Sequence, residues 1–297
     1  MLLDRPLPIK YIIKSVRREM LYVLVVAVVV YYLTKYFRNY LPIMSISIPV
    51  FLGTAISVLL SFKLNQSYDR WWEARKVWGA IVNDSRSLVL QLQLFLKPGN
   101  EQHIAQITKR QIAWCHCLGR SLRGQVPLTA NEKNLSQEEV NRVNSHENKP
   151  LAILQLNTEH IRSLRNSDNV DVYSAVQLNS TIVKLTDAMG MAERINSTVF
   201  PVTYRQYLHY VIYLFVVCLS IALRDIATYF EIPLMLFISA AFFLLEKSAT
   251  LMQDPFRNQP TDISVTTIAL KIETNLRQLI GDSDLPEPLP SQKYFVM

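Results

Sequence analysis

The stretch SYDRWWEARKVWG, residues 67–79, follows an apolar run and interleaves three tryptophans with acidic and basic side chains. On a helix, Trp71, Arg75 and Trp78 lie at positions i, i+4 and i+7, so they share one face. One interpretation is an aromatic belt at a membrane surface, with snorkelling basic side chains. The other is that these side chains join a membrane helix to a polar domain. Both interpretations place the stretch where a helix leaves a membrane.

The composition of the whole chain indicates an integral membrane protein. Of its 297 residues 50% are hydrophobic, and the formal net charge is +7. The basic residues are spread among acidic ones, and the strongest apolar runs fall where bases are sparse, which argues against a nucleic-acid partner. Three cysteines cannot form the even-numbered framework of a small secreted domain, so we expect no disulfides.

Four apolar runs approach or reach the roughly 20 residues that a helix needs to cross about 30 Å of hydrocarbon. No small-residue cleavage site follows the first run, so we expect a retained span and not a signal peptide. The predicted transmembrane helices lie within residues 20–37, 48–62, 207–223 and 232–252.

A long polar block lies between the second and third runs, at residues 63–204. It has helix-like periodicity with breaks at KPGN, GQVP and SHENKP, and it shows no strand pattern of comparable strength. Ser136 and Glu139 are spaced as a capping box at a helix start. An amphipathic stretch at residues 263–280 predicts another helix. The sequence therefore predicts an all-α membrane protein.

Basic residues flank the first two runs on the sides that the positive-inside rule assigns to the cytoplasm. We therefore expect four transmembrane helices per subunit, a large helical cytosolic region, and both termini in the cytoplasm. The expected location is the cell inner membrane. The bases before the first run are Lys10, Lys14, Arg17 and Arg18, and those after the second are Lys63, Arg70, Arg75 and Lys76. The predicted segments are residues 1–62 with the first two transmembrane helices, 63–204 as the cytosolic region, 205–252 with the last two transmembrane helices, and 253–297 as a C-terminal cytosolic segment and tail.

Residues 67–79 closely resemble the signature that follows the second transmembrane helix of the bestrophin family, especially in its bacterial members. The likeness extends to GTAISVLLSF (53–62), to ERINSTVFP (193–201) before the third run, and to DPF (254–256) with an aspartate downstream. It covers the chain from the first run to about residue 265. The family signature falls here on Asp69, Arg70, Trp71, Trp72, Glu73, Arg75 and Trp78.

This resemblance implies a homopentameric ion channel with one central pore. In the family, three rings of apolar side chains spaced four apart on the second helix form a hydrophobic neck, and the matching residues here are Thr54, Val58 and Phe62. A narrow apolar ring blocks ions by excluding water. Thr54 departs from the family pattern, so we expect the outermost ring to be wetter. The alternative interpretation is helix packing through a row of small residues four apart, namely Gly53, Ser57 and Ser61.

The resemblance also implies a second constriction in the cytosolic part, within the helix before ERINSTVFP. We place it at Val172, with Val176 as the next choice. The apolar residues of this helix are spaced three and four apart, which predicts a single apolar face. The residues assigned to that face are Val172, Val176, Ile182, Leu185, Met189 and Ala192. The alternative for both valines is an ordinary position in the core.

Metal binding is not predicted. Vertebrate bestrophins bind calcium through a run of acids after PF, because a hard cation takes six to eight oxygen ligands. The matching stretch here offers Asp254 and Asp262 with Arg257 between them, so we favour a solvated turn over a cation clasp. Residues 115–117 read CHC, but consecutive helical residues point about 100° apart and no second ligand pair follows at zinc-site spacing. We expect no metal and no cofactor.

Three ionisable residues fall in the last two apolar runs. His209 is expected to be an interfacial histidine with its polar atoms satisfied. Glu246 and Lys247 are either charges of an ion pathway or members of pairs and snorkelling groups near the cytosolic end of the fourth run.

The sequence has no motif of a nucleotide-binding, metalloprotease or hydrolase site, so we expect no enzyme. We expect a channel that passes small monovalent ions and self-associates into a pentamer in the lipid bilayer. Eukaryotic relatives conduct anions and bacterial relatives have been associated with cations, so a bacterial signature favours cation selectivity, with an anion (chloride) channel as the alternative. The rival is a non-conducting membrane-anchored scaffold or sensor. A secondary transporter is disfavoured because the four runs show no paired repeats.

Overall fold

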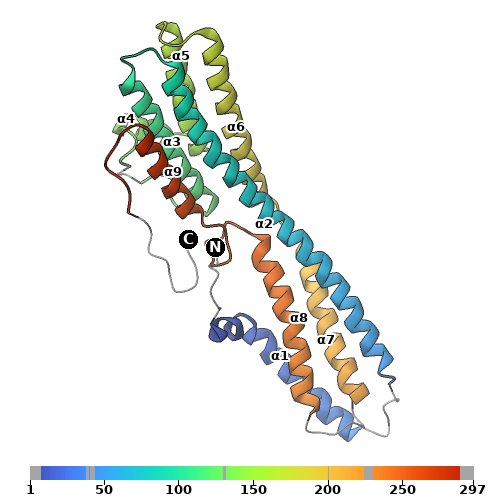
Figure 1. Ribbon diagram of the computed structural model, residues 1–297. Helices are drawn as coiled ribbons and strands as arrows, with labels where there is room; N and C mark the ends of the chain where they lie inside the picture. Colours follow the sequence, from blue (N-terminus) through green and yellow to red (C-terminus); the bar gives the residue numbers. More distant parts are fainter. Residues whose placement is uncertain are drawn as a thin grey trace. The chain divides into compact units, whose positions relative to one another are not determined.

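The computed structural model describes residues 8–37, 40, 44–129, 132–199, 201–223 and 230–287. Most of these residues are helical and none of them lies in a strand, which confirms the all-α prediction for the described chain (Figure 1). The helices are α1 (Ile9–Tyr36), α2 (Ser47–Phe95), α3 (Glu101–Leu122), α4 (Gln137–Asn144), α5 (Lys149–Asn166), α6 (Val172–Ser197), α7 (Val202–Leu223), α8 (Glu231–Gln253) and α9 (Val265–Leu279).

The helices form two compact units. Among the described residues, the span unit falls within Asp4–Arg70 and Val199–Gln253, and the bundle unit contains Trp71–Thr198 and residues 254–287. Helix α2 contributes to both, because its 49 residues run without a break through the predicted boundary at residue 63. At about 1.5 Å per residue, this helix is roughly 70 Å long.

The span unit consists of α1, α7, α8 and the first part of α2, and α1 packs against both α7 and α8 (Figure 1). Its apolar core includes Val23, Ile56, Ile212 and Phe243, which are almost fully buried. Among the described residues, α2, α7 and α8 are long and apolar enough to cross a membrane. Helix α1 contains the predicted first run but is not one of these three, so the count of four spans stays a prediction.

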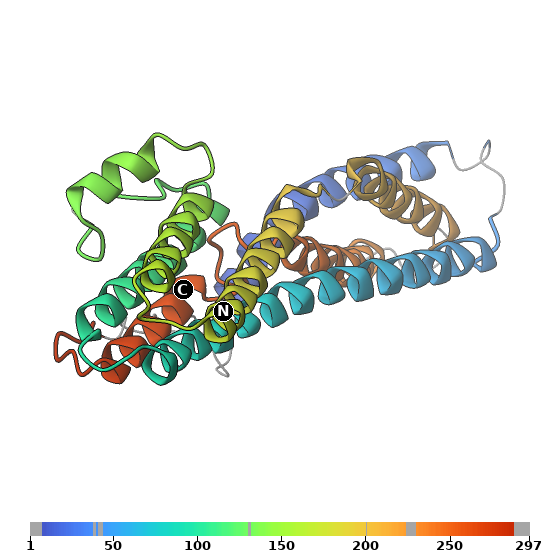
Figure 2. The same ribbon diagram turned by 90° about the horizontal axis from the view of Figure 1, so that it is seen from above.

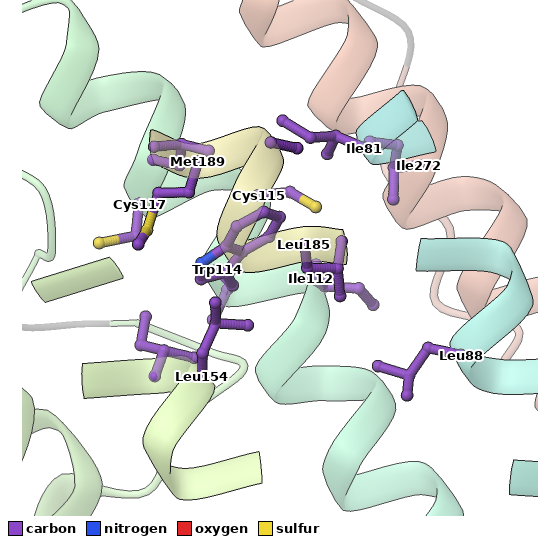
Figure 3. Close-up of a cluster of buried hydrophobic side chains, with 14 of the residues drawn as sticks. Ile81, Leu88, Ile112, Trp114, Cys115, Cys117, Leu154, Leu185, Met189 and Ile272 are labelled. Atoms are coloured by element: carbon purple, nitrogen blue, oxygen red, sulfur yellow. The ribbon is translucent and has the colours of Figure 1, made fainter. Parts of the chain in front are cut away.

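In the bundle unit, α3 packs against α5, α6 and α9, and the short α4 packs against α5 (Figure 1, Figure 2). The last part of α2 joins them through buried apolar side chains such as Ile81 and Leu88. Trp114 of α3 lies in the middle of this core, surrounded by side chains from several helices (Figure 3). Gly119 allows α9 to approach α3 closely, since a Cβ there would lie 2.6 Å from Val265 Cγ1.

Several local predictions for the polar block are confirmed. The Ser136 hydroxyl accepts from the Glu139 backbone N–H at 3.3 Å, and Glu139 accepts from the Ser136 N–H at 2.8 Å, which is the predicted capping box. KPGN separates α2 from α3, SHENKP separates α4 from α5, and GQVP follows the end of α3. The amphipathic stretch at residues 263–280 forms α9.

Candidate functional site

Thr54, Val58 and Phe62 lie on one face of α2 in the span unit, and this face is exposed in the single subunit. Val58 is 50% exposed and Phe62 is 61% exposed, and Phe51, one turn before Thr54, is 72% exposed. The Thr54 hydroxyl donates to the Val50 carbonyl at 2.9 Å, which turns its polar hydrogen back into the helix. The face therefore presents mostly hydrocarbon, and no described part of the same subunit covers it.

The opposite face of α2 is buried within the span unit. Its buried side chains recur at three- and four-residue intervals, as one helix face requires, and include Ile56, Leu60, Lys63 and Ser67. Gly53 of the small-residue row does serve packing, because a Cβ there would lie 3.3 Å from the Phe215 ring of α7. Ser57 and Ser61 of the same row are exposed. Packing and an exposed apolar face thus coexist on the two sides of this helix.

The signature tryptophans have three different environments. Trp78 is completely buried in the bundle unit, and a Cβ on Gly119 of α3 would touch its ring at 3.6 Å. Trp71 is half-buried, and its indole N–H donates to the Thr261 carbonyl at 3.2 Å. Trp72 is 46% exposed and stacks on Trp71 with ring centroids 6.4 Å apart. Trp71 and Trp78 therefore hold α2 to the rest of the bundle unit, while Trp72 lies at its surface.

The charged signature residues lie at the surface or only half-buried. Arg194 of α6 donates to Glu73 at 2.7 Å, and both side chains are exposed. Arg75 lies beside Gly79, whose Cβ would be 3.7 Å from the guanidinium. Arg70 is half-buried. Asp69 is exposed, and within the described ranges of the chain it forms no ion pair.

Val172 and Val176 are exposed on α6, at 57% and 64%. The prediction that they share a face with the later apolar residues of this helix is wrong, and so is the alternative of a core position. At about 100° per residue, the thirteen residues from Val172 to Leu185 leave Leu185 about 140° away, on the other side of the helix. The later residues form the buried face, namely Ile182, Leu185, Met189 and Ala192.

Asp254 and Asp262 lie in different environments. Asp254 is paired with Arg257 at 2.8 Å. Asp262 is 1% exposed and accepts from the Gln259 backbone N–H at 3.0 Å, so the prediction of a solvated turn is wrong for this residue. Burial raises the pKa of Asp262 to about 6.

In the CHC stretch both cysteines lie in the core of the bundle unit, and His116 between them is half-buried. Cys115 and Cys117 are buried, and Figure 3 shows their sulfur atoms pointing apart. Burial raises the pKa of both thiols to about 12, whereas zinc binds the thiolate. His116 contacts Glu273, with His116 Nε2 2.8 Å from Glu273 Oε2. Among the described residues, no group of three or more His, Cys, Asp or Glu side chains is placed to hold a metal ion.

The span unit contains a buried charged cluster that the sequence did not reveal. The Lys63 ammonium is 2.6 Å from Glu246 Oε1, and Glu246 Oε2 is 3.3 Å from His209 Nε2. The sequence indicates Lys63 only as a base flanking the second apolar run. Glu246 was correctly considered a pairing residue, but its partner lies 183 residues away along the chain and not beside it.

The sequence and the fold match known proteins over most of the chain. The family described as "Bacterial/Fungal Bestrophin protein" matches residues 9–278. The relative "Voltage-dependent anion channel-forming protein RSc3414" of Ralstonia nicotianae is 29% identical, covering 82% of this chain and 80% of the relative. "Voltage-dependent anion channel-forming protein YneE" of Salmonella typhi is 30% identical, with the same coverage of 82% and 80%.

Solved structures share the fold. A bacterial bestrophin homologue from Klebsiella pneumoniae superposes with a TM-score of 0.84 at 24% identity, covering 90% of this chain and 99% of the homologue. A variant of that homologue, in which one tryptophan is replaced by alanine, gives a TM-score of 0.83 at 25% identity, with the same coverage of 90% and 99%. Together with the family match over residues 9–278, these likenesses show that the chain belongs to the bacterial and fungal bestrophin family.

Proposed function

We propose that this protein is an ion channel in which several subunits surround a pore lined by the exposed face of α2. The observation that carries the proposal is the apolar, uncovered face of Thr54, Val58 and Phe62 on a helix that is long and apolar enough to span a membrane. The relatives named as anion channel-forming proteins support the same function.

A single subunit cannot enclose a pore with this face, because the face points away from the rest of its own span unit. Copies of the chain arranged around an axis would cover it, and the family resemblance makes five the expected number. In the proposed arrangement α1 is the fourth span, and both termini and residues 63–204 lie on the cytoplasmic side of the cell inner membrane. Residues 1–62 and 205–252 then form the membrane part of each subunit, and residues 253–297 return to the cytoplasm.

The proposed neck consists of rings of Val58 and Phe62 with a ring of Thr54 outside them. Side chains of this kind expel water when the ring is narrow, and an ion cannot pass without its water. The Thr54 hydroxyl already donates to Val50, so this ring offers oxygen acceptors and methyl groups to the pore. Opening therefore requires that the rings widen or turn aside far enough to let water in.

We place the second constriction at Val172, with Val176 next, in the cytosolic part. Both valines are exposed on α6 and point away from the core of the bundle unit, which leaves them free to line a path between subunits. Tyr173, which is 88% exposed, accompanies them at the start of the same helix.

Monovalent anions are the first candidate for the conducted ion, on the printed names of the relatives. The cation selectivity that the bacterial signature favoured is the second candidate. Rings of uncharged side chains do not select the sign of an ion, so the choice falls to charged residues outside the neck. Asp69 is one such residue, since it is exposed on α2 two turns beyond Phe62.

The test is recording from purified protein in planar bilayers under a KCl gradient. Phe62→Ala and Val58→Ala should raise the current, because smaller side chains leave a wider ring that holds water more readily. Phe237→Ala is the matched control, since Phe237 is a comparably exposed aromatic (76%) on the spanning helix α8. The sign of the reversal potential assigns anions or cations. Absence of current from the wild type and both neck variants would leave the membrane-anchored scaffold as the better account.

A further inference from the structure

A buried ion pair lies in the span unit directly beside the proposed neck. Lys63, the residue after Phe62, is 0% exposed, and its ammonium is 2.6 Å from Glu246 Oε1 on α8. The ammonium also donates to Thr250 Oγ1 at 3.0 Å, and Thr250 donates to the same Glu246 oxygen at 2.9 Å. The other Glu246 oxygen lies 3.3 Å from His209 Nε2 on α7. The Glu246 carboxylate thus links α2 to α8, and His209 of α7 lies beside it.

Stability alone does not account for this cluster. A charge within a membrane-spanning unit is expensive unless it is paired, and even a well-paired buried ion pair often stabilises no more than apolar side chains of the same volume. What a buried pair does impose is geometry, because any arrangement that separates the partners leaves two charges without water or a counter-ion. The pair therefore fixes the arrangement of the helices that carry it.

Because Lys63 lies on α2, the ion pair also constrains which side chains of α2 face the proposed neck. Lys63 lies on the buried stripe with Ile56 and Leu60, while Val58 and Phe62 lie on the opposite, exposed stripe. A helix rotates as a rigid body over a few turns, so any rotation that turns Phe62 aside also draws Lys63 away from Glu246.

We propose that the Lys63–Glu246 pair is a positioning clasp that holds α2 in the rotation that presents Val58 and Phe62, and so keeps the neck narrow. This inference rests on the proposed channel function. Neither clasp residue lies on the exposed stripe, so both act through the orientation of α2 and not by contact with the ion. Weakening the clasp should therefore raise the open probability.

The experiment compares single-channel records of the wild type with Lys63→Met, Glu246→Gln and the charge-reversed pair Lys63→Glu with Glu246→Lys. Each single variant should raise the open probability by at least about fivefold, a typical coupling between residues in contact. The reversed pair should return it to within about twofold of the wild type. Arg142→Met is the control, because it breaks an exposed pair with Glu159 in the bundle unit and should leave the open probability unchanged.

A purely structural role predicts a different pattern. The single variants would then lower the unfolding temperature while the open probability of the folded channels stayed at the wild-type value, and this result would overturn the proposal. If the single variants fail to fold, the double variant Lys63→Met with Glu246→Met leaves no buried charge and keeps the proposal testable. Wild-type gating in that double variant would refute the clasp, and an elevated open probability would support it.

A second readout separates the clasp from the channel function itself. A cysteine placed at Phe62 is labelled by a water-soluble thiol reagent at a rate that depends on how α2 presents this position. Combining Phe62→Cys with Glu246→Gln should change that rate by at least about fivefold, whether or not the protein carries current. An unchanged rate contradicts the clasp alone, whereas absence of wild-type current contradicts the channel alone.

Discussion

Asp262 offers a prediction about pH that follows from burial. This carboxyl lies in the turn before α9, accepts one backbone N–H from Gln259, and leaves Oδ1 without a hydrogen-bond partner in the described chain. Burial raises its pKa from 3.8 to about 6. Asp262→Asn keeps an oxygen that accepts the Gln259 N–H and removes the ionisation.

The sign of the effect follows from the direction of this pKa shift. The folded state holds the proton more tightly than the unfolded state, so the contribution of Asp262 to the free energy of unfolding is complete below about pH 4 and is lost as the pH rises through about 6. A rise of about two pKa units corresponds to a loss of about 2–3 kcal/mol. The asparagine variant lacks this loss, so its stability relative to the wild type should increase between about pH 4 and 7.

Thermal unfolding in detergent at a series of pH values from about 4.5 to 8 measures the difference. A loss of about 2–3 kcal/mol corresponds to roughly 3–5 °C in the midpoint for a chain of this size. The control is Asp168→Asn, because Asp168 is 92% exposed and has a φ of 59°, which asparagine also adopts. A difference between Asp262→Asn and the wild type that stays constant with pH would refute the reasoning.

Five further substitutions, in three tests, examine packing and charge. Trp78→Ala should lower the free energy of unfolding by about 3–5 kcal/mol, because the ring is fully buried. Trp72→Ala, at the surface, should lower it by under about 1 kcal/mol. Equal effects in thermal unfolding would contradict the assignment of Trp78 to the core and Trp72 to the surface. Gly119→Ala should destabilise by about 1–3 kcal/mol through its 2.6 Å contact with Val265, whereas Gly190→Ala, with no atom within 4 Å, should stabilise by about 0.5–1 kcal/mol. Asp69→Asn should shift the reversal potential toward the anion equilibrium potential in bilayer recordings, and an unchanged potential would remove Asp69 from the ion pathway.

Much of the helical organisation was predictable because it depends on local signals. The polar block breaks where KPGN and SHENKP interrupt its periodicity, and the Ser136–Glu139 capping box was readable from a four-residue spacing. The signature at residues 67–79 was sufficient to indicate the family, since its residue types and order are specific.

The remaining features depend on contacts between distant residues or on helical phase. Nothing near Lys63 indicates that its partner is Glu246, because the pair forms only when α2 and α8 pack together. Val172 and Val176 were assigned to the wrong face because three- and four-residue spacings were matched locally, without adding up the rotation along the whole helix. Polar turns are usually exposed, which favoured a solvated Asp262, whereas its side chain is buried in the bundle unit.

The most direct test of the central claim is thiol modification of single cysteines on α2 during bilayer recording. The native cysteines are buried, and burial raises the pKa of Cys115 and Cys117 to about 12, so they should react slowly. If the exposed face of α2 lines the pore, a charged thiol reagent should change the current through Val58→Cys and leave Leu60→Cys, on the buried face, unaffected. Current that is insensitive to modification at Val58, or equally sensitive at both positions, would contradict the claim.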